Sequence, residues 1–269
     1  MENKRKTVGL ILGSGADRGM AHIGIIKTLQ KYNIPIDYIS GSSIGAVVGA
    51  YYALYLEVDG LEKTIKAVMK SNLFKLFDFN FFKPSLIKGR KFYDLMKYNL
   101  YGDKIFDDTQ IPLRINATNL DTGNSYIFTN GRILDAVIPS MTIPGILPIV
   151  VNNDVNLIDG GLSDAIPSHI LDEFHPDVII AVDLYSSKME KIEKYNLRSL
   201  LNRIYQIYTT RLSGLSIKEL KNSGANCIIL NPQTNETFES LTFKNIEKNI
   251  KIGMEETESK IEEIKRLLN

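Results

Sequence analysis

A strand, a tight turn and a helix follow one another in residues 36–56, of which residues 36–46 read Ile-Asp-Tyr-Ile-Ser-Gly-Ser-Ser-Ile-Gly-Ala. The apolar start predicts a strand over residues 36–40, and the serine- and glycine-rich centre predicts a turn. A helix is predicted over residues 44–56, where small side chains share one face and permit close packing on a sheet. This succession is typical of α/β proteins.

The same alternation continues on both sides of this unit. Residues 7–12 form a short β-branched and apolar run that ends in a glycine-rich turn, and apolar residues at helical spacing follow over residues 23–32. Strands that alternate with helices predict an α/β fold with a largely parallel, buried sheet. Further strands are predicted at residues 113–118, 125–128, 155–158, 178–182 and 226–230.

Length and composition describe an ordinary globular protein. The 269 residues are 44% hydrophobic and 23% charged, which excludes a mini-protein and a disordered or fibrous chain. The net charge of +1 provides no long-range positive field, so nucleic-acid binding is not expected. The single cysteine, Cys227, excludes an internal disulfide framework and a cysteine-rich zinc site. One domain over residues 1–269 is predicted, with motifs in residues 7–183 and a helical part over residues 190–269.

Neither a signal peptide nor a membrane span is predicted. Basic residues 4–6 precede an apolar run, but that run ends at Gly13 and then meets Asp17 and Arg18. The uncharged window over residues 38–56 begins with the turn, which leaves a helix too short to cross a bilayer. A cytoplasmic protein is expected, either fully soluble or in peripheral contact with a membrane.

Three helical segments stand apart from the alternation. Residues 196–220 have Leu and Ile at helical spacing. Residues 243–268 have an apolar three-four repeat among Lys and Glu, which favours packing on the domain over a coiled-coil dimer or a membrane-surface contact. Residues 57–110 form either a cap over a site or a helix pair that closes the core, and they contain Phe74, Phe77, Phe79, Phe81 and Phe82.

The turn after the second predicted strand contains a candidate nucleophile, Ser43. Residues 41–45 fit the pattern G-x-S-x-G, in which a sharp turn exposes the central hydroxyl while Gly41 and Gly45 avoid Cβ clashes. The helix amino terminus adds positive potential at this point. The same residues also fit a plain turn in which Ser43 caps the helix.

A serine nucleophile needs a base, and the chain offers two kinds. His169 or His175 satisfies the order serine, acid, histidine with Asp159 as the acid, but neither lies in an obvious loop motif. Asp159 itself follows a predicted strand and precedes two glycines, where a carboxylate can face a site and the backbone can approach it closely.

A glycine-rich loop over residues 13–19 follows the first predicted strand. Its N–H groups suit an anion, either a dinucleotide pyrophosphate or the oxyanion of an acyl-transfer intermediate. The spacing G-x-G-x-x-x-G departs from the dinucleotide fingerprint, although Asp37 lies at a suitable distance along the chain for a ribose contact.

Four motifs together resemble the patatin-like phospholipases in order and spacing, over roughly residues 7–183. They are the run from Gly9 that contains Arg18-Gly19-Met20-Ala21-His22-Ile23-Gly24, the run Gly41-Ser42-Ser43-Ile44-Gly45-Ala46, Ile143-Pro144-Gly145 with Pro148, and Asp159-Gly160-Gly161 with Pro167.

This resemblance implies a three-layer α/β sandwich with a largely parallel central sheet between helices. It implies a Ser–Asp dyad in which Ser43 is the nucleophile and Asp159 its base, without histidine, metal or organic cofactor. The implied substrates are phospholipids or lysophospholipids, cleaved through an acyl-enzyme. The implied oxyanion hole comprises Gly13, Gly15, Arg18 and Gly19.

The chain departs from the family pattern at Ser14 and Ala16, where the family usually has glycine. A positive φ at Ala16 costs about 1 kcal/mol. Ala165 replaces an Asn and Pro139 replaces an Ala that are frequent in the family, and none of these departures removes a dyad residue. A lipid-binding relative without turnover and a dinucleotide-dependent oxidoreductase remain the alternatives.

Overall fold

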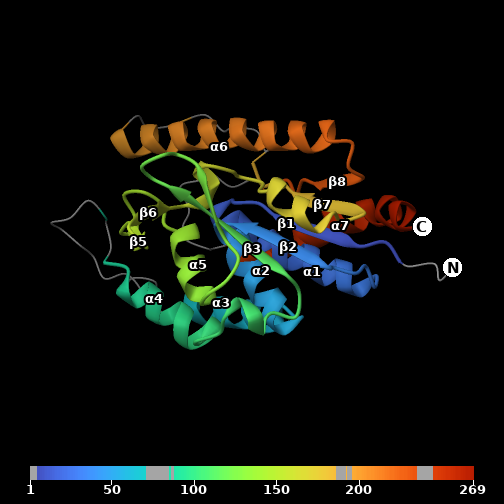
Figure 1. Ribbon diagram of the computed structural model, residues 1–269, viewed down its shortest axis with the longest axis horizontal. Helices are drawn as coiled ribbons and strands as arrows, with labels where there is room; N and C mark the ends of the chain where they lie inside the picture. The colour runs from blue at the N-terminus through green and yellow to red at the C-terminus, as the bar shows by residue number, and fades with distance from the viewer. Residues whose placement is uncertain (1–4, 71–84, 86–87, 186–191, 193–195, 235–244) are drawn as a thin grey trace.

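The computed structural model describes residues 5–70, 85, 88–185, 192, 196–234 and 245–269. Figure 1 shows three layers, with helix α6 (Leu197–Asn222) above a central sheet and helices α1 to α5 below it. The predicted three-layer arrangement is therefore confirmed. The five helices of the lower layer are α1 (Met20–Lys31), α2 (Ile44–Tyr55), α3 (Asp59–Lys70), α4 (Arg90–Met96) and α5 (Ile133–Ser140).

One eight-stranded sheet runs in the order β5-β6-β3-β2-β1-β7-β8, and β4 pairs with β3 beside this path. The pairs β1–β2, β1–β7, β2–β3 and β7–β8 are parallel, whereas β3–β4, β3–β6 and β5–β6 are antiparallel. The largely parallel sheet is thus confirmed. The strands are β1 (Val8–Leu12), β2 (Tyr38–Ser42), β3 (Leu113–Asn119), β4 (Ser125–Phe128), β5 (Val150–Asn152), β6 (Val155–Ile158), β7 (Val178–Val182) and β8 (Cys227–Leu230).

All seven predicted strands are present, and β5 is the addition. Its three residues are partly or fully exposed, so they carry no hydrophobic alternation long enough to predict a strand. Helical turns complete the described elements: η1 (Ala16–Gly19), η3 (Lys97–Tyr101), η4 (Phe106–Asp108), η5 (Gly160–Leu162) and η6 (His169–Phe174).

Strand β1 is buried on both faces of the sheet. Leu10 and Leu12 belong to the main core, which α1, α2 and α5 cover. Ile11 points to the opposite face and packs with Leu171 and Leu220, which come from η6 and α6. Because both faces are covered by helices, β1 consists of an uninterrupted apolar run rather than an alternation.

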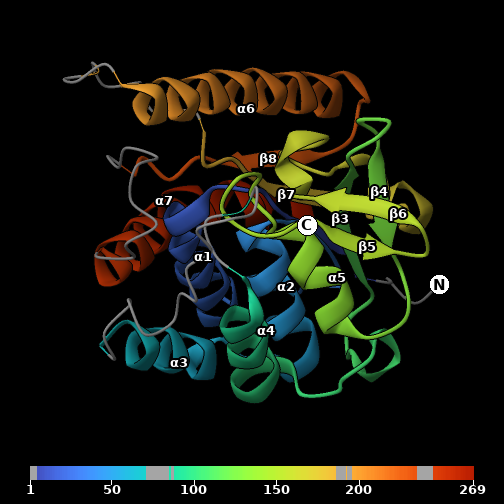
Figure 2. The ribbon, with the colours of Figure 1, turned by 90° about the vertical axis from the view of Figure 1, so that its left-hand side faces the viewer.

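Helix α7 (Ile246–Leu268) packs on α1, as Figure 2 shows, so the prediction that the tail packs on the domain is confirmed. Its apolar repeat is buried at Ile250, Ile261 and Ile264. The two helices approach so closely that a Cβ at Gly253 would collide with the carbonyl oxygen of Ala21. Glycine at this position therefore sets the distance between the helices.

The phenylalanine patch over residues 74–82 lies outside the described residues, so its role as a cap is untested. No helix in the described part of the chain combines the length and the apolar composition that a membrane span requires.

Substitution Gly253→Ala is expected to lower the free energy of unfolding by about 1–3 kcal/mol, because the added methyl group meets backbone that cannot move without separating α1 from α7. Urea denaturation measures the change. The matched control is Gly214→Ala within α6, where an added Cβ meets no atom within 4 Å. This control is expected to raise the stability by about 0.5–1 kcal/mol, and equal effects at the two sites would contradict the close approach of α1 and α7.

Candidate active site

The carboxyl ends of β1, β2 and β6 meet at one edge of the sheet. β1 and β2 are parallel, with Leu12 opposite Gly41, so the loops that follow them lie side by side. β6 joins this edge through β3, where Ile158 pairs with Thr118. Asp159 directly follows β6 and therefore arrives at the edge where sites of parallel α/β sheets form.

Ser43 occupies a strained turn between β2 and α2, with φ 55° and ψ −123°. A Cβ at Gly45 would collide with the carbonyl oxygen of Leu12, and a Cβ at Gly41 would lie 2.7 Å from the carbonyl oxygen of Gly45. The two glycines of the G-x-S-x-G pattern are therefore required by close backbone approach. The Ser43 side chain makes no helix-capping hydrogen bond, so the capping alternative is wrong.

The Ser43 hydroxyl donates a hydrogen bond of 2.6 Å from Oγ to Oδ2 of Asp159. Ser43 is 5% exposed and Asp159 is fully buried. The other carboxylate oxygen of Asp159, Oδ1, accepts a hydrogen bond of 2.8 Å from the Gly161 N–H. The structure thus brings together the two residues that the sequence singled out as nucleophile and base.

The backbone of Asp159 is also held on both sides. Its N–H donates to the carbonyl oxygen of Thr142 at 2.9 Å, and its carbonyl oxygen accepts from Oγ1 of Thr118 at 2.7 Å. The carboxylate therefore reaches Ser43 from a fixed main chain.

Burial raises the pKa of Asp159 from 3.8 to about 6, and the hydrogen bonds from Ser43 and Gly161 oppose this rise. A carboxylate with a pKa near 6 accepts a proton more readily than an ordinary aspartate, yet it is ionised at neutral pH. Burial thus suits Asp159 to act as a general base.

The three histidines lie away from the nucleophile. His22 is fully buried, and its Nε2 hydrogen-bonds the Gly13 carbonyl oxygen at 2.8 Å, while burial lowers its pKa to about 4. His169 Nδ1 lies 3.0 Å from Asp164 Oδ2, and this carboxylate raises the pKa of the imidazole. His175 is exposed beyond η6. No histidine hydrogen-bonds to Ser43, so the geometry favours Asp159 over His169 and His175 as the base.

The glycine-rich loop borders the dyad. A Cβ at Gly161 would collide with Oγ of Ser14, and a Cβ at Gly19 would collide with the side chain of Ile44. The Ser14 N–H is occupied, because it donates to the Ala165 carbonyl oxygen at 2.9 Å. Within the described residues, no hydrogen bond occupies the N–H of Gly15 or Ala16, so these groups remain available to an anion.

Arg18 brings a buried positive charge to this loop. It is 3% exposed, its Nε donates to the Gly15 carbonyl oxygen at 3.2 Å, and its guanidinium lies 4.7 Å from the centre of the Tyr185 ring. One terminal nitrogen, Nη2, has no hydrogen-bond partner in the described structure. Tyr185 also accepts a hydrogen bond of 3.1 Å from Ser14, so it contacts two side chains of this loop, Ser14 and Arg18.

Sequence reasoning missed three residues that position the site: Asn116, Ser140 and Tyr185. The Ser43 N–H donates to Oγ of Ser140 at 2.8 Å, and that hydroxyl donates to the Asn116 carbonyl oxygen at 2.6 Å. Nothing in a single sequence marks them, because a lone Ser, Asn or Tyr follows no motif. Only the parallel pairing of Ser42 with Asn116 brings β3 to the nucleophile.

Asp37 lies at the other end of the sheet from the glycine-rich loop. It precedes β2, its N–H donates to the Val8 carbonyl oxygen at 2.8 Å, and its carboxylate accepts hydrogen bonds from Arg5 and from the Val8 N–H. The ribose contact on which the dinucleotide alternative depends is therefore absent from this geometry.

Comparison with known proteins assigns the family. The profile described as patatin-like phospholipase matches residues 10–172. The chain belongs to the patatin-like phospholipase family. This match covers the nucleophile turn, the glycine-rich loop and the aspartate motif, so the resemblance seen in the sequence is confirmed.

Curated patatin-family relatives include lysophospholipases of fungi. The chain is 33% identical over 213 residues to lysophospholipase NTE1 of Pyricularia oryzae, which covers 78% of this chain and 13% of that protein. It is also 33% identical over 184 residues to lysophospholipase nte1 of Neurospora crassa, which covers 67% of this chain and 12% of that protein. The chain thus spans about an eighth of the length of these relatives.

A solved structure agrees with the patatin-like fold. The crystal structure of VipD from Legionella pneumophila superposes with a TM-score of 0.52 and 14% identity, over 96% of this chain and 67% of that one. At this identity the likeness concerns the fold alone.

Ala16 has φ 52°, which lies in the left-handed region that glycine adopts without strain. Substitution Ala16→Val is expected to lower the free energy of unfolding by about 1–3 kcal/mol, because a β-branched side chain is strained in the left-handed region. Ala16→Gly relieves the Cβ strain and is expected to leave stability within about 1 kcal/mol of the parent. Thermal or urea unfolding distinguishes the two, and a harmless Ala16→Val would contradict the observed loop conformation.

The raised pKa of Asp159 predicts the pH dependence of catalysis. Below about pH 6 the carboxylate is protonated and cannot accept the Ser43 proton, so kcat/KM for a soluble ester is expected to rise with pH through an apparent pKa of about 6. A pH–rate profile over the acidic range measures this value. A midpoint at the ordinary aspartate value of 3.8 would contradict the effect of burial.

Proposed function

We propose that this chain is a serine acyl hydrolase that cleaves fatty-acyl esters of phospholipids or lysophospholipids with a Ser43–Asp159 dyad. The observation that carries the proposal is the direct hydrogen bond between Ser43 Oγ and the buried carboxylate of Asp159. Family membership supports the same reaction class, since the matching profile is that of the patatin-like phospholipases.

In the acylation step, Ser43 Oγ attacks the ester carbonyl carbon while Asp159 takes the hydroxyl proton. The 2.6 Å separation allows this transfer without a bridging water. The tetrahedral intermediate then collapses, the bond between the carbonyl carbon and the alcohol oxygen breaks, and Asp159 returns the proton to the departing alcohol. The product is an acyl group bound to Ser43.

The glycine-rich loop is proposed to stabilise the negative oxygen of this intermediate. The N–H groups of Gly15 and Ala16 are the donors that the loop leaves available, and the buried Arg18 charge adds positive potential. Each well-placed donor contributes about 3–4 kcal/mol to the transition state. Of the predicted oxyanion-hole residues, Gly13 and Gly19 serve through close packing, because a Cβ at either would collide with its neighbours.

Deacylation reverses the roles of the oxygen atoms. A water molecule attacks the acyl-enzyme carbonyl, Asp159 takes one of its protons, and Ser43 leaves as that proton returns to Oγ. The fatty acid is released and the enzyme is regenerated.

A lipid substrate is supported by an apolar groove beside the site. The groove has a volume of about 560 Å³, and it includes Pro139 and Thr142, which flank Ser140. Ser140 accepts the Ser43 N–H and Thr142 accepts the Asp159 N–H, so the segment of residues 139–142 connects the groove to the two residues of the proposed dyad. Its apolar lining suits an acyl chain: Phe92, Leu134, Ile138, Leu147 and Ile149. The names of the fungal relatives favour lysophospholipids among the candidate substrates.

Hydrolysis of p-nitrophenyl acyl esters of increasing chain length tests the dyad. Ser43→Ala and Asp159→Asn are each expected to lower kcat/KM by about a thousandfold or more, because one removes the nucleophile and the other the base. A rate that grows with chain length would support the acyl groove.

Two matched controls accompany these variants. Ser42→Ala removes the neighbouring serine, whose Oγ has no hydrogen-bond partner in the described structure, and His169→Gln removes the alternative base. Both are expected to retain activity. Folded parent and variants that are equally inactive would favour the lipid-binding alternative, and activity that survives Asp159→Asn but not His169→Gln would overturn the dyad.

A further inference from the structure

Helix α6 turns four polar side chains inward beside the buried Leu220 and leaves a row of large apolar side chains exposed, unlike an ordinary surface helix. Its buried polar residues are Ser199, Thr209, Ser213 and Ser216. Its outward side forms what we call the outer strip, whose large apolar side chains are each between 46% and 56% exposed: Leu200, Leu201, Ile204, Ile207, Tyr208 and Leu215.

Hydrogen bonds on the inner side hold the strip outward. Ser213 donates to Asp183 at 2.7 Å, and Ser216 donates to Asp164 at 2.9 Å. As whole residues, Asp164 is 8% exposed and Asp183 is 4% exposed. Rolling α6 to cover the outer strip would remove a donor from two buried charges, so the exposed orientation is the stable one.

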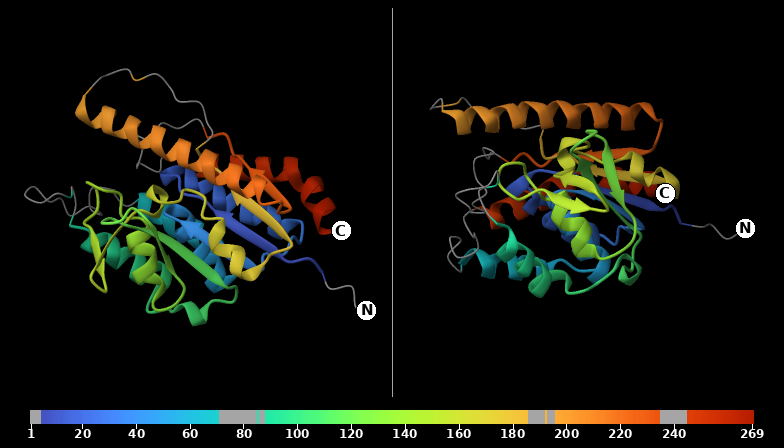
Figure 3. Two further views of the ribbon diagram at one scale, coloured as in Figure 1. Left: turned by 45° about the horizontal axis from the view of Figure 1, so that its top comes forward. Right: turned by 60° about the vertical axis from the view of Figure 1, so that its left-hand side comes forward.

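The outer strip lies beside the catalytic edge. The Tyr208 hydroxyl donates to the carbonyl oxygen of Leu162 at 2.8 Å, and Leu162 ends the helical turn that begins directly after Asp159. Both views of Figure 3 show α6 along one side of the molecule. A flat partner that covered the strip would therefore meet the protein next to the dyad.

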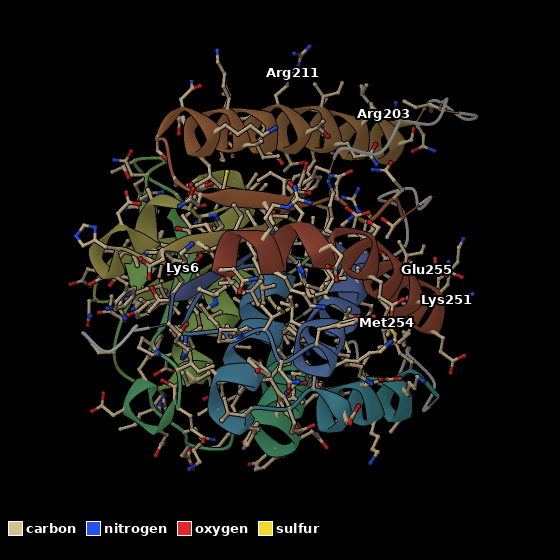
Figure 4. The ribbon with its side chains drawn as sticks, turned by 90° about the vertical axis from the view of Figure 1, so that its right-hand side faces the viewer. Lys6, Arg203, Arg211, Lys251, Met254 and Glu255 are labelled. Atoms are coloured by element: carbon tan, nitrogen blue, oxygen red, sulfur yellow. The ribbon has the colours of Figure 1, made fainter. Side chains whose placement is uncertain are left out.

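The excess of basic over acidic residues on α6 favours an anionic partner. Arg211, Lys218 and Lys221 are exposed on this helix, whereas Glu219 is its single acidic residue. Figure 4 shows Arg211 on the outer side of α6. None of these three cations forms an ion pair with a described residue. Apolar side chains with basic neighbours are the pattern of helices that lie in the interface of anionic membranes.

A second copy of the chain fits the strip less well. Two α6 helices face to face would bring their cations together with few acidic partners. From Leu200 to Leu215 the strip is about 23 Å long and about 10 Å wide. Its area is less than a third of the roughly 800 Å² per partner that a standard protein interface buries.

We propose that the outer strip of α6 docks on the surface of an anionic phospholipid bilayer. The Leu and Ile side chains enter the boundary between headgroups and acyl chains, and the basic side chains meet lipid phosphates. Docking places the dyad next to a lipid substrate. This consequence rests on the proposed function, whereas the docking surface itself does not. The predicted phenylalanine patch is not needed for it.

Vesicle flotation tests the docking surface without turnover when every protein carries Ser43→Ala. The parent is expected to float with vesicles of phosphatidylcholine and phosphatidylglycerol, and the pair Leu201→Ser, Ile204→Ser is expected to weaken binding by about tenfold or more. The control pair Leu56→Ser, Ile105→Ser removes the same two side-chain types, 39% and 40% exposed, at the end of α2 and before η4. This control is expected to bind like the parent.

Rates measured with an intact Ser43 separate the two proposals. The α6 pair is expected to keep the parent's rate on a soluble short-chain ester and to lose rate only on vesicle phospholipid. An inactive parent that still floats would overturn the proposed function and leave the docking surface standing. Equal flotation of the α6 pair and the parent would overturn the docking surface, as would a dimer in light scattering that the α6 pair converts to a monomer.

Discussion

The hydrogen bond between Ser43 Oγ and Asp159 Oδ2 joins two residues that lie 116 positions apart in the chain. In water an aspartate is too weak a base to draw a proton from a serine hydroxyl, since its pKa lies near 4. Burial raises the pKa of Asp159 to about 6 because it destabilises the charged carboxylate, and a buried carboxylate therefore needs hydrogen-bond donors at its oxygens. Ser43 supplies the donor to Oδ2 and the Gly161 N–H supplies the donor to Oδ1.

The donors reach the Asp159 carboxylate because segments of backbone approach one another closely, and glycine permits this close approach. Gly45 lets the first turn of α2 pass the end of β1, and Gly161 lets the aspartate loop pass Ser14. Ser43 and Ala16 have positive φ in these loops, which costs about 1 kcal/mol or more at each residue. Such strain persists where the surrounding structure holds the backbone in place. The strained turn at Ser43 directs the Ser43 hydroxyl away from the backbone and toward the carboxylate of Asp159.

Buried carboxylates that need hydrogen-bond donors also determine the orientation of α6 at the surface. The buried carboxylates of Asp164 and Asp183 accept hydrogen bonds from Ser216 and Ser213. These bonds keep the serine side chains of α6 facing inward, and the outer strip therefore faces away from the domain. The site and the proposed docking surface are therefore linked by one segment, residues 159–164, which runs from Asp159, the proposed base, to Asp164, the partner of Ser216. An enzyme whose substrate resides in a bilayer requires this proximity, because its reacting ester cannot travel far from the lipid surface.

Sequence patterns predicted seven of the eight strands of the described sheet and singled out Ser43 and Asp159 as candidates, and the family resemblance implied that they form a dyad. This worked because hydrophobic periodicity and glycine spacing are local properties, and the nucleophile turn and the aspartate motif each lie within a few residues. Only the tertiary structure decided that Asp159, rather than His169 or His175, reaches Ser43, and that Ser140 and Asn116 hold the nucleophile's backbone. It alone decided which side of α6 faces water, since residues 196–220 show helical spacing whichever side is buried. These outcomes depend on the pairing of distant strands and on the partners of buried carboxylates, and neither is encoded in the order of neighbouring residues.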